Sequence, residues 1–145
     1  MIDESVLFLS AHDLGEKIRA RKISPVELTE AYLAKLEGAG KKLGGVVTVT
    51  RDLALEQARR AEKEIRAGSI RSPLHGVPYG AKDLLATKGI PTTWGATPYK
   101  DQVFTYDATV IRRLEKAGAV LLGKLAMVEL AGGLGYRYAS ASITG

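Results

Sequence analysis

The chain of 145 residues is the size of one ordinary domain, and its 46% hydrophobic and 26% charged residues are typical of a soluble globular protein. It contains no cysteine, which excludes disulfides, thiolate metal sites and a cysteine nucleophile. The net charge of +5 gives little support to a nucleic-acid surface, because most basic residues alternate with glutamates on expected helix faces and aromatic residues make up only 6%.

The N-terminal run MIDESVLFLS carries acidic residues where a secretory signal would carry basic ones, and its apolar part is short. No stretch approaches the roughly 18 apolar residues of a membrane-spanning helix. We therefore expect a cytoplasmic protein that makes no membrane contact. The two histidines, His12 and His75, are far apart and in no metal-ligand spacing. We interpret them as a surface residue and a loop residue, and we expect neither a metal nor a cofactor.

Three amphipathic helices are predicted in the first half of the chain. Ser10 can cap the first helix, with Asp13 three residues further on. In the run SPVE at 24–27, a capping hydroxyl, a proline at the first helical position and a glutamate at the third predict the second helix. The third helix is expected from 52 to 67, with an apolar stripe on one side and a charged, solubilising face on the other.

Strands are predicted between and after these helices. The β-branched run at 46–50 predicts a short strand, and the run at 77–85 predicts another. After a loop rich in Thr, Gly and Pro at 86–104, Asp107 can cap a helix through residue 117, and its expected inner face is Val110, Ile111 and Leu114. A continuous apolar strand at 119–122 follows, and a further loop and helix are expected from about residue 125. The alternation of helices with apolar strands predicts an α/β fold with a largely parallel sheet covered by helices.

Lys82 stands out because it lies in the strand predicted at 77–85. Side chains alternate along a strand, so Lys82 shares a face with Gly80 and Leu84, and its small neighbours leave room for a ligand. A lysine covered on both sides of a sheet loses the hydration of its charged form, which lowers its pKa from about 10.4 towards neutrality. The neutral amine could then accept a proton from a serine hydroxyl as a general base.

A purely structural role for Lys82 remains open at this point. The lysine could lie at the strand end and extend into solvent, or it could pair with Asp83 or another acidic residue. Asp83 itself could cap the following loop or hold the local geometry. A phosphate-binding loop is excluded at Lys82, because this lysine does not end a GxxxxGK motif and does not open a helix.

Several long motifs resemble the amidase signature family. They are PLHGVPYGAKD at 73–83, TKGIPTT at 87–93, YDATV at 106–110, and the AGA and LGK runs at 117–119 and 122–124. The helix start SPVELT at 24–29 also resembles the N-terminal region of this family. The resemblance covers nearly the whole chain, with its motifs in order and correctly spaced.

This resemblance implies an α/β enzyme with a mixed central sheet wrapped by helices. Such enzymes hydrolyse carboxamides, or release ammonia from glutamine in tRNA-dependent amidation, with a Ser-Ser-Lys triad. By match to the motif, Lys82 is the lysine base, which deprotonates a bridging serine that in turn activates the nucleophilic serine. The segment MVELAGG at 127–133 corresponds to a border of the substrate pocket, so Ala131, Gly132 and Gly133 are its candidate lining. A helix end followed by a turn is an equally open interpretation of these three residues.

The Gly/Ser-rich segment that supplies both serines in this family is expected beyond residue 145. Ser140 and Ser142 lack the surrounding glycines and are interpreted as loop or strand residues. We therefore expect residues 1–145 to be the N-terminal portion of a single amidase domain, inactive alone, whose partners are a small amide substrate and the C-terminal portion of the same enzyme. The sequence also departs from the family pattern at one point, where Leu125-Ala126 replaces the Thr-Asn of many relatives.

Three alternatives remain open from the sequence. The chain could be a non-catalytic interaction domain derived from the amidase fold, or a component of a tRNA-dependent amidotransferase, which would contact nucleic acid only indirectly. Lys82 could also act as a Schiff-base amine with a carbonyl substrate.

Overall fold

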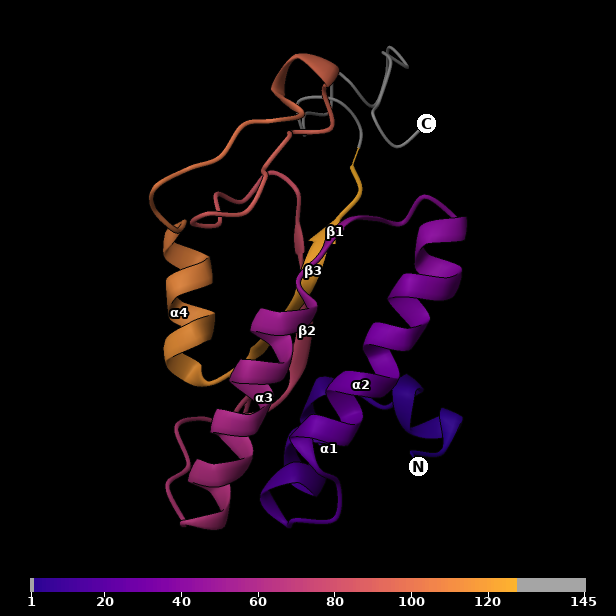
Figure 1. The fold of residues 1–145 in the computed structure, drawn as a ribbon. Helices are drawn as coiled ribbons and strands as arrows, with labels where there is room; N and C mark the ends of the chain where they lie inside the picture. The colour runs from indigo at the N-terminus through magenta and orange to yellow at the C-terminus, as the bar shows by residue number, and fades with distance from the viewer. Residues whose placement is uncertain (1, 128–145) are drawn as a thin grey trace.

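The computed structural model describes residues 2–127, in which helices cover a small sheet (Figure 1). The elements in chain order are the 3₁₀ helix η1 (Glu4–Phe8), α1 (Ala11–Arg19), α2 (Pro25–Lys35), the π-helical turn η2 (Leu36–Gly40), β1 (Val46–Val49), α3 (Arg51–Arg66), β2 (Pro78–Lys82), the 3₁₀ helix η3 (Thr97–Tyr99), α4 (Thr109–Ala117) and β3 (Val120–Leu125).

The three strands form one sheet in the order β1-β3-β2, with β3 in the centre. β2 and β3 are parallel and are joined through α4, which is the usual crossover between parallel strands. β1 runs antiparallel to β3. The α/β class predicted from the sequence is therefore confirmed. The expectation of a largely parallel sheet is wrong, because the sheet is mixed, as the family resemblance implied.

Helices lie on both faces of the sheet (Figure 1). On one face, Leu33 of α2 and two alanines of α3 pack against Val120 and Leu122 of β3. On the other face, Ile111 of α4 packs against Leu121 and Ala81. Because β3 is covered on both sides, its residues are almost all buried, which explains its continuous apolar run.

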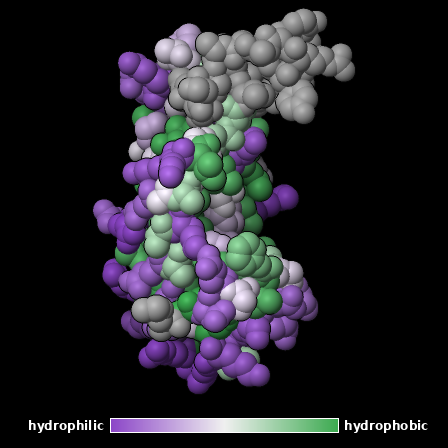
Figure 2. Space-filling view, turned by 90° about the vertical axis from the view of Figure 1, so that its right-hand side faces the viewer, coloured by the Kyte–Doolittle hydropathy of each residue, from purple (hydrophilic) through white to green (hydrophobic). Residues whose placement is uncertain are grey.

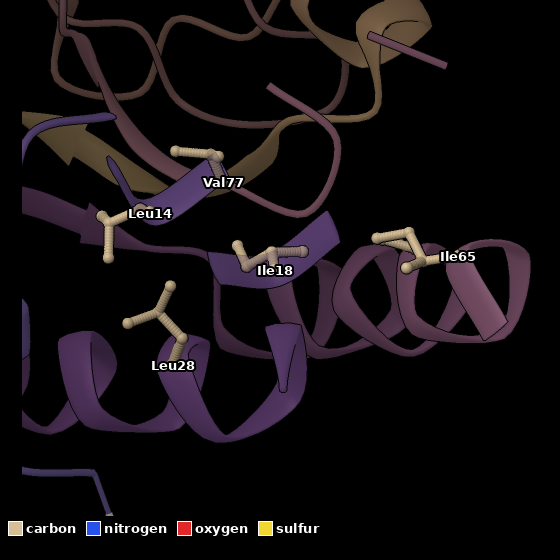
Figure 3. Close-up of a cluster of buried hydrophobic side chains, with 6 residues drawn as sticks. Leu14, Ile18, Leu28, Ile65 and Val77 are labelled. Carbon is tan, nitrogen blue, oxygen red and sulfur yellow. The ribbon is translucent and has the colours of Figure 1, made fainter. Parts of the chain in front are cut away.

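A third apolar cluster joins α1 and α2 to the rest of the fold. Leu14 and Ile18 of α1, Leu28 of α2, Ile65 of α3 and Val77 just before β2 converge in the interior (Figure 3). The face on the side of α1 and α2 carries mostly hydrophilic residues in its lower half, and hydrophobic residues gather in its upper half (Figure 2). Among the residues that the structure describes, no helix combines the length and apolar character needed to cross a membrane.

Two of the predicted helix caps are confirmed. The Ser10 hydroxyl accepts the backbone N–H of Asp13 at 3.1 Å and begins α1. The Ser24 hydroxyl accepts the backbone N–H groups of Val26 and Glu27 and begins α2, with Pro25 at the first helical position. These bonds satisfy amide groups that lack a partner within the helix.

The predicted cap of α4 is wrong. α4 begins at Thr109 and has no side-chain cap. The Asp107 carboxylate instead accepts the backbone N–H of Lys88 at 2.7 Å, which ties the loop after β2 to the start of α4. The expected inner face is also only partly right, because Ile111 is buried and Leu114 half-buried whereas Val110 is 42% exposed. The side chain of a short polar residue can accept a hydrogen bond from any backbone N–H that the fold brings near. The sequence alone does not show that the N–H of Lys88 lies next to Asp107.

His75 and Gly118 form a tight contact where β2 and β3 begin. Gly118 follows α4 with a left-handed φ of 87°, and its carbonyl accepts the Gly76 N–H at 2.8 Å. A Cβ at Gly118 would overlap Cδ2 of the His75 ring, which is buried. Gly118 is therefore required both for its conformation and for the space that it leaves.

Replacement of Gly118 by alanine is expected to destabilise the protein by about 2–5 kcal/mol, from left-handed strain together with overpacking against a buried ring. Gly68 is a matched control, because its φ is 81° and no atom lies within 4 Å of the site of an added Cβ. Gly68→Ala should therefore cost only about 1–2 kcal/mol, the strain alone. Denaturant unfolding of both variants measures the difference. Equal losses in the two variants would contradict the packing argument.

His75 also predicts a pH dependence of stability. Its Nδ1 accepts the backbone N–H of Arg71 at 3.1 Å, so the proton is on Nε2, which lies 3.1 Å from Oε2 of Glu64. Burial lowers the pKa of His75 below its usual value, although Glu64 opposes this effect. The unfolded chain therefore binds a proton at a higher pH than the folded protein does.

The free energy of unfolding should consequently fall as the pH is lowered from about 7 through the ordinary histidine pKa of about 6.5. The decrease should stop at the lowered pKa of the folded state. In the variant His75→Asn this contribution should disappear, whereas the surface variant His12→Asn should keep it. Thermal melts between pH 7.5 and pH 5 make the comparison, and an identical pH dependence in His75→Asn would refute the assignment.

Candidate active site

Lys82 is the last residue of β2, at the carboxyl ends of the two parallel strands. Its side chain is exposed, and so are Gly80 and Leu84, whereas Ala81 and Asp83 are buried. The predicted alternation of faces around Lys82 is therefore confirmed. β2 ends earlier than predicted, at residue 82 instead of 85, so within residues 2–127 Lys82 lies at a strand end that is open to solvent.

The exposed face beside Lys82 is shaped by a glycine. Lys82 is opposite Leu125 in the parallel register, and the Leu125 side chain leans over Gly80. A Cβ at Gly80 would lie 2.7 Å from Leu125 Cδ1, so a larger residue at this position would displace the leucine side chain. Lys82 is therefore surrounded on this exposed face by a small residue, Gly80, and an apolar one, Leu125. Carboxyl ends of parallel strands are the usual place for ligands in α/β folds.

Asp83 does not pair with Lys82, which corrects one of the alternatives predicted for the lysine. The Asp83 side chain points to the opposite, buried face, where it accepts hydrogen bonds from the backbone N–H of Thr93 at 3.1 Å and from the Thr93 hydroxyl. Its backbone N–H donates to the Leu125 carbonyl, and its carbonyl accepts the N–H of Trp94. The predicted role of Asp83 in holding the following loop is confirmed by these bonds.

Lys124 provides the charge opposite Asp83. It is 0% exposed, and its Nζ donates to the Leu85 carbonyl at 2.8 Å and to the Thr92 hydroxyl at 2.7 Å. Nζ also lies 3.4 Å from Oδ1 of Asp83, an oxygen that accepts no hydrogen bond within residues 2–127. Burial lowers the pKa of Lys124, and the Asp83 carboxylate opposes this effect.

The loop after β2 carries a row of aromatic side chains. Trp94 contacts Tyr99, with ring centroids 4.9 Å apart, and Phe104 at 6.2 Å, and Phe104 contacts Tyr106 at 5.3 Å. Trp94 has a left-handed φ of 53°, held by its N–H bond to Asp83 and by the bond from Gly95 to the Thr93 hydroxyl. The loop is therefore attached to Asp83, the residue that directly follows β2.

The predicted site residues are only partly described. Lys82 is placed as above, whereas the candidate pocket residues Ala131, Gly132 and Gly133 lie outside the described residues, as do Ser140 and Ser142. Sequence reasoning missed the buried pair of Asp83 and Lys124. The available signal was a second lysine directly after an apolar strand, in the LGK run at 122–124.

Residues 27–144 match the family model described as Amidase. The chain belongs to the amidase family. The match includes β2, β3 and Lys82, and thus all of the geometry described above.

Individual relatives of this family agree with the match. The chain is 43% identical over 125 residues to a glutamyl-tRNA(Gln) amidotransferase subunit of Geobacter sp. strain M21, covering 86% of this chain and 26% of that protein. It is 40% identical over 127 residues to the putative amidase AmiD of Mycobacterium bovis. This match covers 88% of this chain and 27% of AmiD. The chain therefore spans about a quarter of the length of these curated relatives.

Solved amidase structures share the fold. The native peptide amidase of Stenotrophomonas maltophilia superposes with a TM-score of 0.78 at 32% identity, covering 84% of this chain and 25% of that chain. A bacterial aryl acylamidase of the amidase signature family superposes with a TM-score of 0.77 at 29% identity. The superposition covers 86% of this chain and 26% of that chain. The order of helices and strands described here is thus that of the corresponding quarter of these enzymes.

Proposed function

We propose that this chain is the N-terminal portion of an enzyme that hydrolyses the C–N bond of carboxamides, with Lys82 as its general base. The observation that carries the proposal is the position of Lys82 within the family match. Its amine rises at the carboxyl ends of two parallel strands, beside the small residue Gly80. The loop that follows Lys82 is bonded to β3 through Leu125 and Lys124, and these bonds hold the backbone next to Lys82 in place.

In this proposal the chemistry is a relay of one proton. The neutral amine of Lys82 accepts the proton of a bridging serine, which accepts that of the nucleophilic serine. The nucleophilic oxygen attacks the amide carbon, and as the C–N bond breaks the leaving nitrogen takes up the proton that Lys82 had accepted, returned through the bridging serine. Water then hydrolyses the acyl ester to release the acid. Both serines come from polypeptide outside the described residues.

The exposure of Lys82 within residues 2–127 fits this proposal in one respect. A base that must reach a hydroxyl from another segment cannot be covered by its own β-strand and helices. The exposed face formed by Gly80, Lys82, Leu84 and Leu125 is the surface on which the serine segment would lie. Coverage of this face would also remove the amine from water, which is the condition for a lysine to act as a base.

The test is ammonia release by the full-length product of the gene that encodes this chain. Primary carboxamides with aliphatic, aromatic and peptide acyl groups are the substrates, and the matching methyl esters show whether acyl transfer needs the amide. We expect ammonia and acid in equal amounts from at least one amide class. Absence of release from every class, by a folded full-length protein, would contradict the proposal.

A second candidate function is that of the ammonia-releasing component of a tRNA amidotransferase. The observation that favours it is that several relatives with 41–44% identity are named as glutamyl-tRNA(Gln) amidotransferase subunits. In this case glutamine should be the preferred amide, and ammonia release should depend on further subunits. A free amidase should instead turn over simple amides alone, which separates the two candidates.

A further inference from the structure

The stability of the fold does not explain why Asp83 and Lys124 form a buried ion pair. Both side chains are 0% exposed, and their charged atoms are 3.4 Å apart. Removal of two charges from water costs several kcal/mol per ion, and well-packed apolar residues in place of such a pair are often equally stable or more stable. An ionic pair in this position therefore calls for another explanation.

A bulge in β3 places Lys124 beside Asp83. Tyr79 is opposite Leu121 and Gly80 is opposite Gly123, so Leu122 has no partner in β2. With strict alternation Lys124 would be on the face opposite to Leu121. The extra residue reverses the alternation, and Lys124 is opposite Ala81, on the buried face that also carries Asp83. Bulges are rare between parallel strands, and bulges in general are over-represented next to active sites, where they redirect a side chain.

The pair fixes the residue that directly follows Lys82. All of the main-chain polar groups of Asp83 are bonded, to Leu125 and to Trp94, and its side chain holds Thr93. The ammonium of Lys124 joins this assembly to two more points of the same loop, the Leu85 carbonyl and the Thr92 hydroxyl. The turn after Lys82 is thus held by hydrogen bonds between its own residues and by hydrogen bonds to β3.

We propose that Asp83 and Lys124 are positioning residues that hold the backbone of Lys82 in register for the reaction; this inference rests on the proposed function. The amine of Lys82 projects from one face of the sheet, and the pair locks the same strand end from the other face. Two opposite charges provide directional bonds to several points of the loop, which apolar side chains in the same volume could not.

The test uses the full-length gene product and the double variant Asp83→Asn/Lys124→Met, which removes both charges together. We expect kcat to fall by about tenfold or more with KM changed less than about twofold, because misplacement of a reacting group affects the chemical step. Gly118→Ala is the matched control. It should lower the melting temperature without changing kcat, since it lies at the other end of β3 from Lys82.

A milder variant, Thr92→Val, tests the same inference if the double variant does not fold. Thr92→Val keeps the shape of the side chain and removes one acceptor of the Lys124 ammonium. It should lower kcat in the same direction by a few-fold, with KM unchanged. Wild-type kcat in Thr92→Val, or in a folded double variant, would overturn the inference.

Lys82→Ala, measured in parallel, separates the two ideas. If it keeps full turnover, the proposed function fails. If it is inactive while the pair variants keep wild-type kcat, only the positioning role fails.

Discussion

Replacement of Lys82 by alanine is expected to reduce amide hydrolysis by the full-length gene product by at least about 10²–10⁴-fold, the usual contribution of a general base. The fold should be retained, because the Lys82 side chain is exposed within residues 2–127 and none of the hydrogen bonds that anchor the loop comes from it. Initial rates of ammonia release, with the melting temperature measured on the same samples, test both parts of this expectation.

Lys63→Ala is the control for this experiment, because Lys63 is also an exposed lysine and lies in the last turn of α3, away from the carboxyl end of β2. It should keep the wild-type rate. A Schiff-base role for Lys82 would give the same loss of activity, but borohydride would then trap a carbonyl compound on the wild-type lysine. Covalent trapping of this kind would contradict the general-base assignment.

Lys124→Met is expected to lower the free energy of unfolding by about 3–5 kcal/mol, because it leaves the buried Asp83 carboxylate without its counter-charge. The variant also leaves the Leu85 carbonyl and the Thr92 hydroxyl without their donor. Chemical denaturation of the full-length product measures the loss.

The double variant Asp83→Asn/Lys124→Met should be more stable than Lys124→Met alone, because no unpaired charge remains in the interior. An asparagine can still accept the Thr93 N–H through its side-chain oxygen. If the loss of stability in Lys124→Met comes from an unpaired buried charge, the double variant should recover it. If the loss comes from poorer packing of the methionine, the double variant should not recover it. A free energy of unfolding for Lys124→Met within about 1 kcal/mol of wild type would contradict the burial of the pair.

Much of the fold could be predicted because it depends on neighbours in the sequence. Ser10 and Ser24 cap helices through amides two or three residues away, so the local pattern contains both partners. The alternation of Gly80, Lys82 and Leu84 followed from the geometry of any strand. Gly118 ends α4 in the left-handed conformation for which glycine is preferred.

The parts that could not be predicted depend on distant contacts. The side chain of Asp107 binds Lys88 in place of its own helix, and His75, predicted only as a loop residue, is buried against Gly118. The face on which Lys124 lies depends on the bulge at Leu122, which appears only when β3 is paired with β2. Tertiary pairing, and not the local sequence alone, therefore decides that Lys124 is buried.

Chemical rescue of Lys82→Ala is the most direct test of the claim that an amine at this position acts as the base. Methylamine and larger primary amines, added to the full-length variant, should restore part of the hydrolysis of an anilide substrate, followed as aniline release. The rate should increase with the concentration of the unprotonated amine, and guanidinium or sodium chloride at equal ionic strength should have no effect. Turnover of the anilide by Lys82→Ala at the wild-type rate without any added amine would contradict the account.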